Sequence, residues 1–149
     1  MFTVLEPDAA RITPHSHKPT HDRAPEELAL GSPLWLRDDL ASIVGEGQVH
    51  SRVIDLVKYA TDASPYRMFP KIVVSPRTVD EIARIFGYAR SKKLAVTIRA
   101  AGSSLSGQSQ GDGILIDARK HWAGATVEDG GKRLRVRPGI QAAECQLLI

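Results

Sequence analysis

A run of small residues and hydroxyls between two apolar segments is the part of this sequence best suited to binding a ligand. It extends over residues 99–109 and reads Arg-Ala-Ala-Gly-Ser-Ser-Leu-Ser-Gly-Gln-Ser. Few bulky side chains would keep a ligand away from this backbone, and successive N–H groups in turns form a concave anion site. The first interpretation is a loop that holds a phosphate or pyrophosphate, helped by the hydroxyls of Ser103, Ser104, Ser106 and Ser109.

Two familiar nucleotide-binding motifs do not fit this run. Gly102 and Gly107 have the spacing of a P-loop, but Gln108 stands where that motif has the lysine that reaches the phosphates. The run also leads into a strand-like segment, residues 113–117, instead of a helix. The dinucleotide fingerprint Gly-x-Gly-x-x-Gly is absent as well. An NTPase and a Rossmann site are therefore disfavoured, and an ordinary surface connection is the alternative to a phosphate loop.

The remaining reactive residue types do not form a catalytic or metal-binding pattern. His15, His17 and His21 lie in a polar segment without a cysteine or carboxylate cluster, so we interpret them as part of a solvated tail. His121 is expected in a surface turn. Cys145 is expected to be a core-facing or exposed thiol, not a nucleophile.

Length and composition predict one soluble globular domain. The chain has 149 residues, of which 42% are hydrophobic and 25% charged, enough to bury a core. A net charge of +3 suits an anionic ligand but is too small to indicate nucleic acid, and 5% aromatic residues disfavour a base-stacking platform. One cysteine and no long apolar run lead us to expect a cytoplasmic protein without a transmembrane segment. Peripheral attachment at the inner membrane face stays open.

The residues around the loop predict strands that alternate with helices. Residues 71–75 are rich in β-branched side chains and predict a strand. Thr78 and Glu81 have the spacing of a capping box, and apolar residues then recur on one helical face. Residues 95–99 predict the strand that leads into the loop. A strand, a helix and a strand within about 30 residues are typical of a βαβ unit with parallel strands.

Two helices are predicted before this unit. Ser32 is expected to cap the first of them, with Pro33 at its first helical position and Gly45 at its end. The second helix should begin after Ser51 and stop before Pro65.

A buried strand and a hairpin are predicted after the loop. Residues 113–117 form an unbroken apolar run that favours burial on both faces. Residues 125–129 and 133–137 predict a hairpin around two glycines, and residues 141–149 the start of a helix. Alternating arginines of the second hairpin strand indicate a solvated face, with an anion-facing or partner-facing strip as the alternative: Arg133, Arg135 and Arg137.

Taken together, these motifs resemble the FAD-binding domain of FAD-linked oxidases, the superfamily of vanillyl-alcohol oxidase and p-cresol methylhydroxylase. The resemblance rests on residues 70–76, the helix from Thr78, the loop at 99–108, Asp117 with the basic residues after it, and residues 137–140. Tyr-Ala-Thr-Asp-Ala-Ser-Pro-Tyr at 59–66 is similar to the D-lactate dehydrogenase and glycolate oxidase branch. The resemblance extends from about residue 33 to residue 149.

The resemblance implies an α+β fold, namely the first subdomain of a PCMH-type FAD-binding domain. Residues 1–31 would then be a flexible tail, and residues 32–149 the N-terminal portion of a domain that is incomplete at its C-terminus. The implied cofactor is FAD, held non-covalently because Ser103 stands where some relatives carry a tethering histidine. The implied cofactor-binding residues are Ala100, Ala101, Gly102, Ser103, Ser104, Leu105, Ser106, Gly107, Gln108, Pro70, Pro138 and Gly139.

The resemblance further implies a flavin-dependent oxidoreductase that acts on a 2-hydroxy acid such as D-lactate or glycolate. In the complete enzyme, hydride would pass from the substrate to flavin N5. The second FAD subdomain and the cap domain are not expected in this chain, so no catalytic residue and no metal ligand is assigned to it. One alternative is a non-catalytic half-domain, or split enzyme, that completes its FAD site with another chain. A phosphate-binding protein unrelated to flavin is a third hypothesis.

Overall fold

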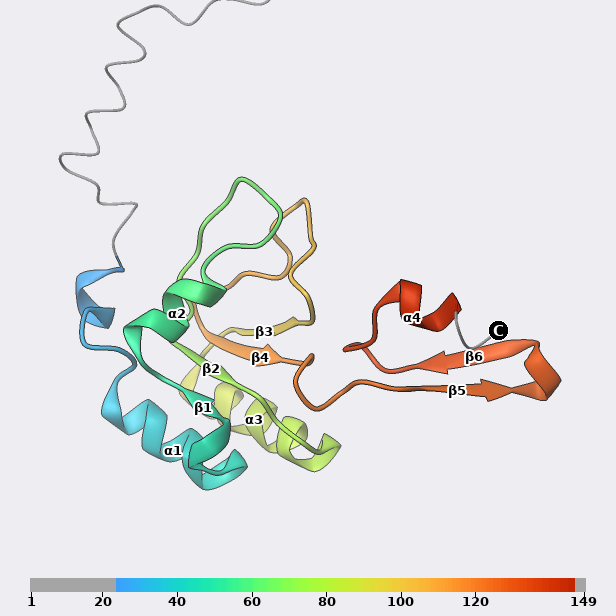
Figure 1. The fold of residues 1–149 in the computed structure, drawn as a ribbon. Coiled ribbons are helices and arrows are strands. Elements are labelled where there is room, and N and C mark those ends of the chain that lie inside the picture. Colours follow the sequence, from blue (N-terminus) through green and yellow to red (C-terminus); the bar gives the residue numbers. More distant parts are fainter. Residues whose placement is uncertain (1–23, 147–149) are drawn as a thin grey trace, which may run out of the picture.

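A four-stranded sheet is the centre of the fold (Figure 1). The structure, a computed structural model, describes residues 24–146. The strands lie in the order β1 (Val49–His50), β2 (Ile72–Val74), β4 (Ile114–Asp117) and β3 (Val96–Arg99). β2 and β3 both run parallel to β4, whereas β1 is antiparallel to β2. The predicted βαβ unit is therefore present, but β4 lies between its two parallel strands.

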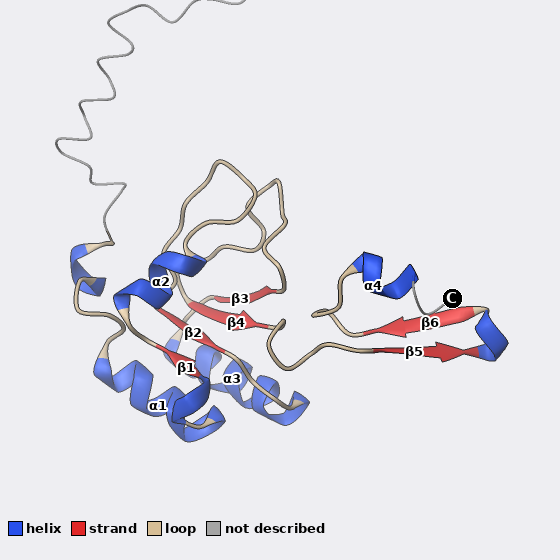
Figure 2. Cartoon of the chain, viewed as in Figure 1, coloured by secondary structure: helices blue, strands red, loops and turns tan. Residues whose placement is uncertain are grey.

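Helices lie on both faces of this sheet, and one further helix lies beside the C-terminal hairpin (Figure 2). Their bounds are α1 Leu34–Val44, α2 Val53–Tyr59, α3 Val79–Lys92 and α4 Ala142–Gln146, with short 3-10 helices at Glu26–Leu28, Glu46–Gln48 and Asp129–Gly131. Leu36 and Ile85, from α1 and α3, pack in one core cluster with alternate residues of β2 and β4. Leu56 of α2 packs in a second cluster with Val73 and Leu115 on the opposite face. β4 is thus buried on both faces, as predicted.

The start of α3 confirms the predicted capping box. Thr78 Oγ1 accepts a hydrogen bond from the backbone N–H of Glu81 (3.1 Å), and Glu81 Oε2 accepts one from the backbone N–H of Thr78 (3.3 Å). These bonds satisfy donors that no residue within the helix can reach. The helix ends at Lys92 and is followed by the C-cap residue Lys93, whose φ of +55° is left-handed.

The first helix begins one residue later than predicted, and this corrects the role of Ser32. Pro33, with a ψ of 136°, takes the N-cap position, so Ser32 precedes the cap and makes no capping bond. The Ser32 side chain is buried, and its backbone N–H donates to the carbonyl of Ser51 (2.7 Å). Gly45 ends the helix as predicted, with a φ of +85°.

Part of the predicted N-terminal tail packs against the fold. Residues 1–23, with the three histidines of that segment, lie outside the described residues. Leu28, however, is buried with Leu56 and Leu115. The segment that precedes α1 is therefore anchored by apolar burial, which the polar composition of residues 1–31 concealed. The division of the chain at residue 31 stays a prediction.

The predicted hairpin projects away from the sheet (Figure 1). β5 (Ala125–Glu128) pairs antiparallel with β6 (Arg133–Val136). Two arginines on its polar face form ion pairs at 2.6 Å, Arg133 with Asp129 and Arg135 with Glu128. These arginines are exposed, as the interpretation of a solvated face requires.

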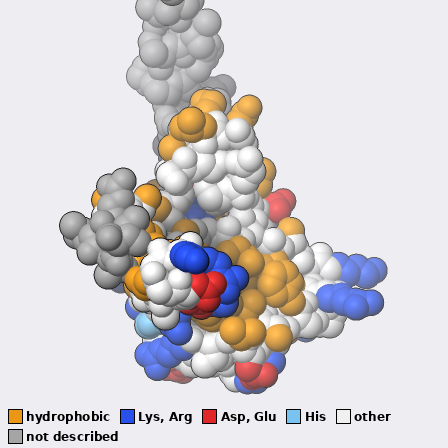
Figure 3. Space-filling view, turned by 90° about the vertical axis from the view of Figure 1, so that its right-hand side faces the viewer, with side chains coloured by type: hydrophobic (Ala, Val, Ile, Leu, Met, Phe, Trp, Pro, Cys, Tyr) orange, Lys and Arg blue, Asp and Glu red, His pale blue; other side chains and the backbone are white. Residues whose placement is uncertain are grey.

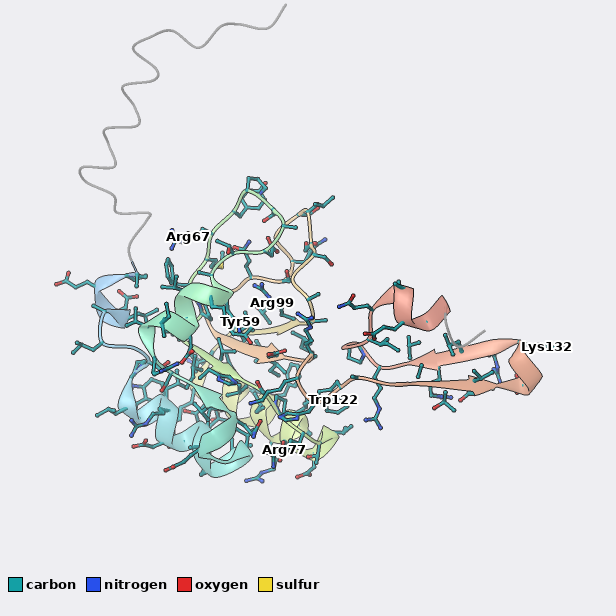
Figure 4. The ribbon with its side chains drawn as sticks, in the orientation of Figure 1. Tyr59, Arg67, Arg77, Arg99, Trp122 and Lys132 are labelled. Carbon is teal, nitrogen blue, oxygen red and sulfur yellow. The ribbon has the colours of Figure 1, made fainter. Side chains whose placement is uncertain are left out.

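The junction between sheet and hairpin shows that His121 is not a simple surface residue. Trp122 Nε1 donates to the carbonyl of Pro76 (2.8 Å), and Figure 4 places Trp122 where the hairpin leaves the sheet. His121 is half-buried, and its Nε2 lies 2.6 Å from the side-chain amide of the buried Gln48. Cys145 is half-buried. Among the described residues, no helix has the length and apolar character needed to cross a membrane.

Candidate functional site

Two loops lie side by side above one face of the sheet. One follows α2, and the other, residues 100–113, connects β3 to β4 (Figures 1 and 4). The backbone N–H of Ala63 in the first loop donates to the carbonyl of Gly102 in the second (3.0 Å). The second loop runs back along the sheet, because Thr97 Oγ1 in β3 donates to the carbonyl of Gln110 (3.4 Å). The 100–108 run leads into a strand, as predicted.

The backbone of the second loop is turned so that several N–H groups have no protein partner. Gly102 and Gly107 have φ values of +76° and +81°, which favour glycine. Ser104 Oγ accepts hydrogen bonds from the N–H groups of Ser106 (3.2 Å) and Gln108 (3.1 Å), which tightens the turn. Within the described part of the chain, the N–H groups of residues 101–105 donate to no protein atom. These donors are available to an anion.

Arg99 supports this turn from below. Its Nη1 donates to the carbonyl oxygens of Tyr59 (3.1 Å) and Thr61 (2.7 Å), and its guanidinium lies 5.4 Å from the centre of the Tyr59 ring. Figure 4 shows Arg99 and Tyr59 between the loops and the sheet. A Cβ atom on Gly102 would lie 2.4 Å from Arg99 Nη2. The loop can therefore approach the guanidinium this closely only with glycine at this position.

An open pocket of about 500 Å³ lies beside the loop, where β3 and β4 end. The carboxyl ends of these parallel strands meet at one edge, because Arg99 is paired with Asp117 in the register. Four cationic side chains and one carboxylate face the pocket, so its field favours an anion. The lining residues are His50, Lys58, Tyr59, Arg99, Ala100, Ala101, Asp117, Arg119 and Lys120.

The carboxylate in the pocket is occupied by protein donors. Tyr59 Oη donates to Asp117 Oδ2 (2.6 Å), and the backbone N–H of Arg119 donates to Asp117 Oδ1 (2.8 Å). Burial, and then the hydrogen bond to Asp117, raise the pKa of the Tyr59 phenol well above its ordinary value. Tyr59 is therefore protonated at neutral pH, and its hydroxyl donates the hydrogen bond that positions the Asp117 carboxylate.

His50 adds no positive charge to the pocket at neutral pH. Burial first, and the nearby charge of Lys120 second, lower the pKa of the His50 imidazole below its ordinary value. Its Nε2 lies 2.8 Å from Ser75 Oγ. The positive field consequently comes from Lys58, Arg99, Arg119 and Lys120 together.

The structure brings most of the predicted site residues to this region. Ala100 and Ala101 line the pocket, and residues 102–108 form the loop beside it. Gly139 packs closely on the segment after β4, since its Cβ would lie 2.7 Å from the Arg119 carbonyl oxygen, and the exposed Pro138 precedes it.

Pro70 lies elsewhere. It is fully buried just before β2, at the amino edge of the sheet, whereas Arg99 and Asp117 lie at the carboxyl edge. The structure therefore does not bring Pro70 to the pocket.

Several pocket residues were not predicted as binding residues. Lys58 lies on α2 and His50 on β1, and nothing in their local sequence indicates a site. Asp117 and the basic residues after it carried part of the resemblance to FAD-linked oxidases, and that is the one signal that could have assigned them. Pocket membership depends on the strand order, which sequence periodicity does not specify.

Comparisons with known proteins agree on one family. Residues 70–147 match the family model described as an FAD binding domain. The chain is 30% identical over 107 residues to D-2-hydroxyglutarate dehydrogenase from Haemophilus influenzae, an alignment that covers 69% of this chain and 10% of that protein. It is 28% identical over 90 residues to glycolate oxidase subunit GlcD from Escherichia coli, covering 58% of this chain and 18% of that subunit.

A comparison of structures gives the same fold. The crystal structure of p-cresol methylhydroxylase with substrate bound matches with a TM-score of 0.59 at 15% sequence identity, over 75% of this chain and 23% of that chain. The chain spans about a tenth of the length of D-2-hydroxyglutarate dehydrogenase and less than a fifth of GlcD.

Proposed function

Because the chain belongs to the FAD binding domain family, we propose that the 100–108 loop and the cationic pocket beside it hold the diphosphate of FAD. The α+β fold predicted from the sequence, with its PCMH-type topology, is confirmed by the family match and by the likeness to p-cresol methylhydroxylase. The observation that carries the proposal is the juxtaposition of unpaired backbone N–H groups at 101–105 with four cationic side chains. A diphosphate needs both directed donors and a positive field.

The shape of the loop fits such a group. The backbone of Gly102 has the left-handed φ that favours glycine, and the serines beside it offer hydroxyl donors. Lys58, Arg119 and Lys120 would supply the charge that balances the diphosphate. We propose that FAD is held without a covalent bond, since Ser103 in the loop carries a hydroxyl and not an imidazole.

The proposed reaction is the oxidation of a 2-hydroxy acid. D-2-hydroxyglutarate dehydrogenase and glycolate oxidase are named for substrates of this class, which supports the assignment. Bound FAD would supply the acceptor for the hydride that leaves the substrate. Among the described pocket side chains, Tyr59 is protonated at neutral pH and His50 Nε2 lies within hydrogen-bond distance of Ser75 Oγ, so we assign neither as a catalytic base. The proposed role of this part of the protein is to bind and orient the cofactor.

The hairpin supports a proposal that further polypeptide completes the site. Val127 and Val136 share the apolar face of the hairpin and are 45% and 49% exposed. Figure 3 views the molecule from the side toward which the hairpin projects, and it shows exposed hydrophobic side chains on that side of the molecule. An isolated two-stranded hairpin is marginally stable in water. We propose that a second FAD subdomain covers this face, in the same chain or in a separate subunit.

A titration with FAD tests the cofactor proposal. Binding to the folded chain should quench flavin fluorescence and shift the visible flavin spectrum, and Gly102→Leu should abolish both changes, because its side chain would displace the Arg99 guanidinium that supports the loop. Gly47→Ala is the matched control, because a Cβ there meets no atom within 4 Å. An absence of binding at millimolar FAD, with folding verified by circular dichroism, would refute the proposal.

A further inference from the structure

The first of the two loops carries a carboxylate, Asp62, that the proposed function leaves without a role. Asp62 of the Tyr59–Tyr66 motif accepts hydrogen bonds from two groups of Ser64, the backbone N–H (2.9 Å) and Oγ (2.5 Å). The same carboxylate also accepts one from Ser109 Oγ (2.7 Å) and one from Gln110 Nε2 (2.5 Å). Ser109 and Gln110 directly follow the proposed diphosphate loop. Asp62 therefore joins the first loop to Ser109 and Gln110, which lie 47 and 48 residues after it in the chain.

Gln110 is held in this arrangement through its donors. The residue is only 8% exposed, and its Nε2 also lies within hydrogen-bond distance of Ser64 Oγ (3.1 Å) and the Tyr66 carbonyl oxygen (3.0 Å). Its Oε1 is buried and has no partner among the described residues. The side chain is thus oriented by acceptors in the first loop, above all by the carboxylate of Asp62.

The two loops are also joined at the other end of the diphosphate loop. Ala63 donates to the Gly102 carbonyl (3.0 Å), and Arg99 donates to the Thr61 carbonyl (2.7 Å). The unpaired N–H groups at 101–105 lie in the chain between Arg99 and Ser109, the outer contacts of the two sets. Fixing both ends of a short segment restricts the conformations of the residues between them.

We propose that Asp62 is a positioning residue that shapes the diphosphate loop by clasping Ser109 and Gln110. The proposal rests on the proposed binding of FAD. Asp62 acts through these two residues and needs no contact with the cofactor. A loop that already has its binding shape loses less conformational entropy when the ligand binds, so the clasp would raise affinity.

The carboxylate stays ionised throughout the neutral range. Burial acts to raise the pKa of Asp62, but the hydrogen bonds from Ser64, Ser109 and Gln110 outweigh it and hold the pKa well below its ordinary value. The clasp should accordingly be insensitive to pH between about 5 and 9, because the ordinary value is already near 4.

Hydrogen exchange of the cofactor-free chain, measured by mass spectrometry, tests the clasp independently of FAD. Asp62→Ala should accelerate exchange in peptides that cover 61–66 and 100–110, while peptides of the β2 and β4 core keep their protection. Gln110→Glu has nearly the same shape but places a carboxylate against Asp62, and it should act in the same direction. Asp112→Asn is the matched control, because Asp112 is exposed and lies just outside the clasp. Its exchange pattern should equal that of the original chain.

FAD affinity provides the second readout. Asp62→Ala should raise the Kd for FAD at least tenfold, whereas Asp62→Asn, which keeps one acceptor and can donate to Ser109 Oγ, should recover most of that loss. If Asp62→Ala unfolds the chain, Ser109→Ala is the milder variant. It should also accelerate exchange in the peptides of the two loops, and it should raise the Kd for FAD severalfold.

Two results overturn the clasp: unchanged exchange at 100–110 in both Asp62→Ala and Gln110→Glu, or an unchanged Kd in a chain that binds FAD. Accelerated loop exchange in a chain that binds no FAD would instead refute the proposed function and leave the clasp as a property of the loop.

Discussion

Replacing Gly102 by alanine tests whether the loop is built around the Arg99 guanidinium. Gly102 has a φ of +76°, and left-handed backbone costs an L-residue about 1–2 kcal/mol. A new Cβ would also lie 2.4 Å from Arg99 Nη2 and 2.6 Å from Cζ, distances that force the guanidinium to move. The substitution therefore combines backbone strain with the displacement of a side chain.

The cost of moving the guanidinium follows from its contacts. Its Nη1 donates to the carbonyl oxygens of Tyr59 and Thr61. The contact with Thr61 is exposed to solvent, so we assign about 1.5 kcal/mol to the two bonds together, which is the low end of the range for a single hydrogen bond to a charged group. With the backbone strain included, the free energy of unfolding should fall by about 3 kcal/mol.

Urea denaturation of a double-mutant cycle separates the two contributions. In an Arg99→Ala background the clash is absent, so Gly102→Ala should cost only the backbone strain, about 1–2 kcal/mol. The coupling between the positions should then be about 1.5 kcal/mol, while Gly47→Ala should change stability by less than about 0.5 kcal/mol. Equal costs of Gly102→Ala in both backgrounds would refute the claim that the guanidinium supports the loop.

Three further predictions follow from single contacts. Thr78→Ala removes the cap of α3 and should lower the free energy of unfolding by about 1 kcal/mol, seen as a Tm lower by a few degrees. The raised pKa of Tyr59 contributes stability that is fully present below about pH 10, the unfolded pKa, and is lost as the pH rises above it. Tyr59→Phe should therefore weaken the alkaline loss of stability, and an alkaline limb identical to the original chain would contradict a raised pKa of Tyr59 in the folded chain. Lys120→Gln should raise the pKa of His50 in an NMR titration, because the charge of Lys120 disfavours the imidazolium, and an unchanged pKa would show that Lys120 does not act on His50.

The elements of the fold were predictable because their signals are local. The capping box at Thr78 and the helical spacing after it use residues within one or two turns of each other, and both were confirmed. Strand order is set by contacts between distant segments. Even so, the unbroken apolar run at 113–117 predicted a strand buried on both faces, and β4 is such a strand. A strand buried on both faces must have neighbours and covering helices, so the central position of β4 agrees with its sequence.

The site was predictable only where its chemistry is contained in one segment. Residues 100–108 stand out because small residues and hydroxyls are contiguous there. Lys58 occupies the exposed side of a helix, where a lysine normally indicates a solvated face, and only the fold brings it beside Asp117. Strand direction would have separated Arg99 and Asp117, which end parallel strands, from Pro70, which precedes one.

The features that separate this loop from a P-loop explain how the proposed site is built. A P-loop obtains its charge from one lysine in the motif and its directed donors partly from the helix that follows. Here Gln108 replaces that lysine and a strand replaces that helix. In the proposed site, the charge comes from α2 and from the segment after β4, and the donors come from a turn supported by Arg99 and clasped by Asp62. Removing any one pocket lysine should therefore weaken FAD binding less than disturbing the turn, because the charge is shared among four side chains whereas the turn has one shape.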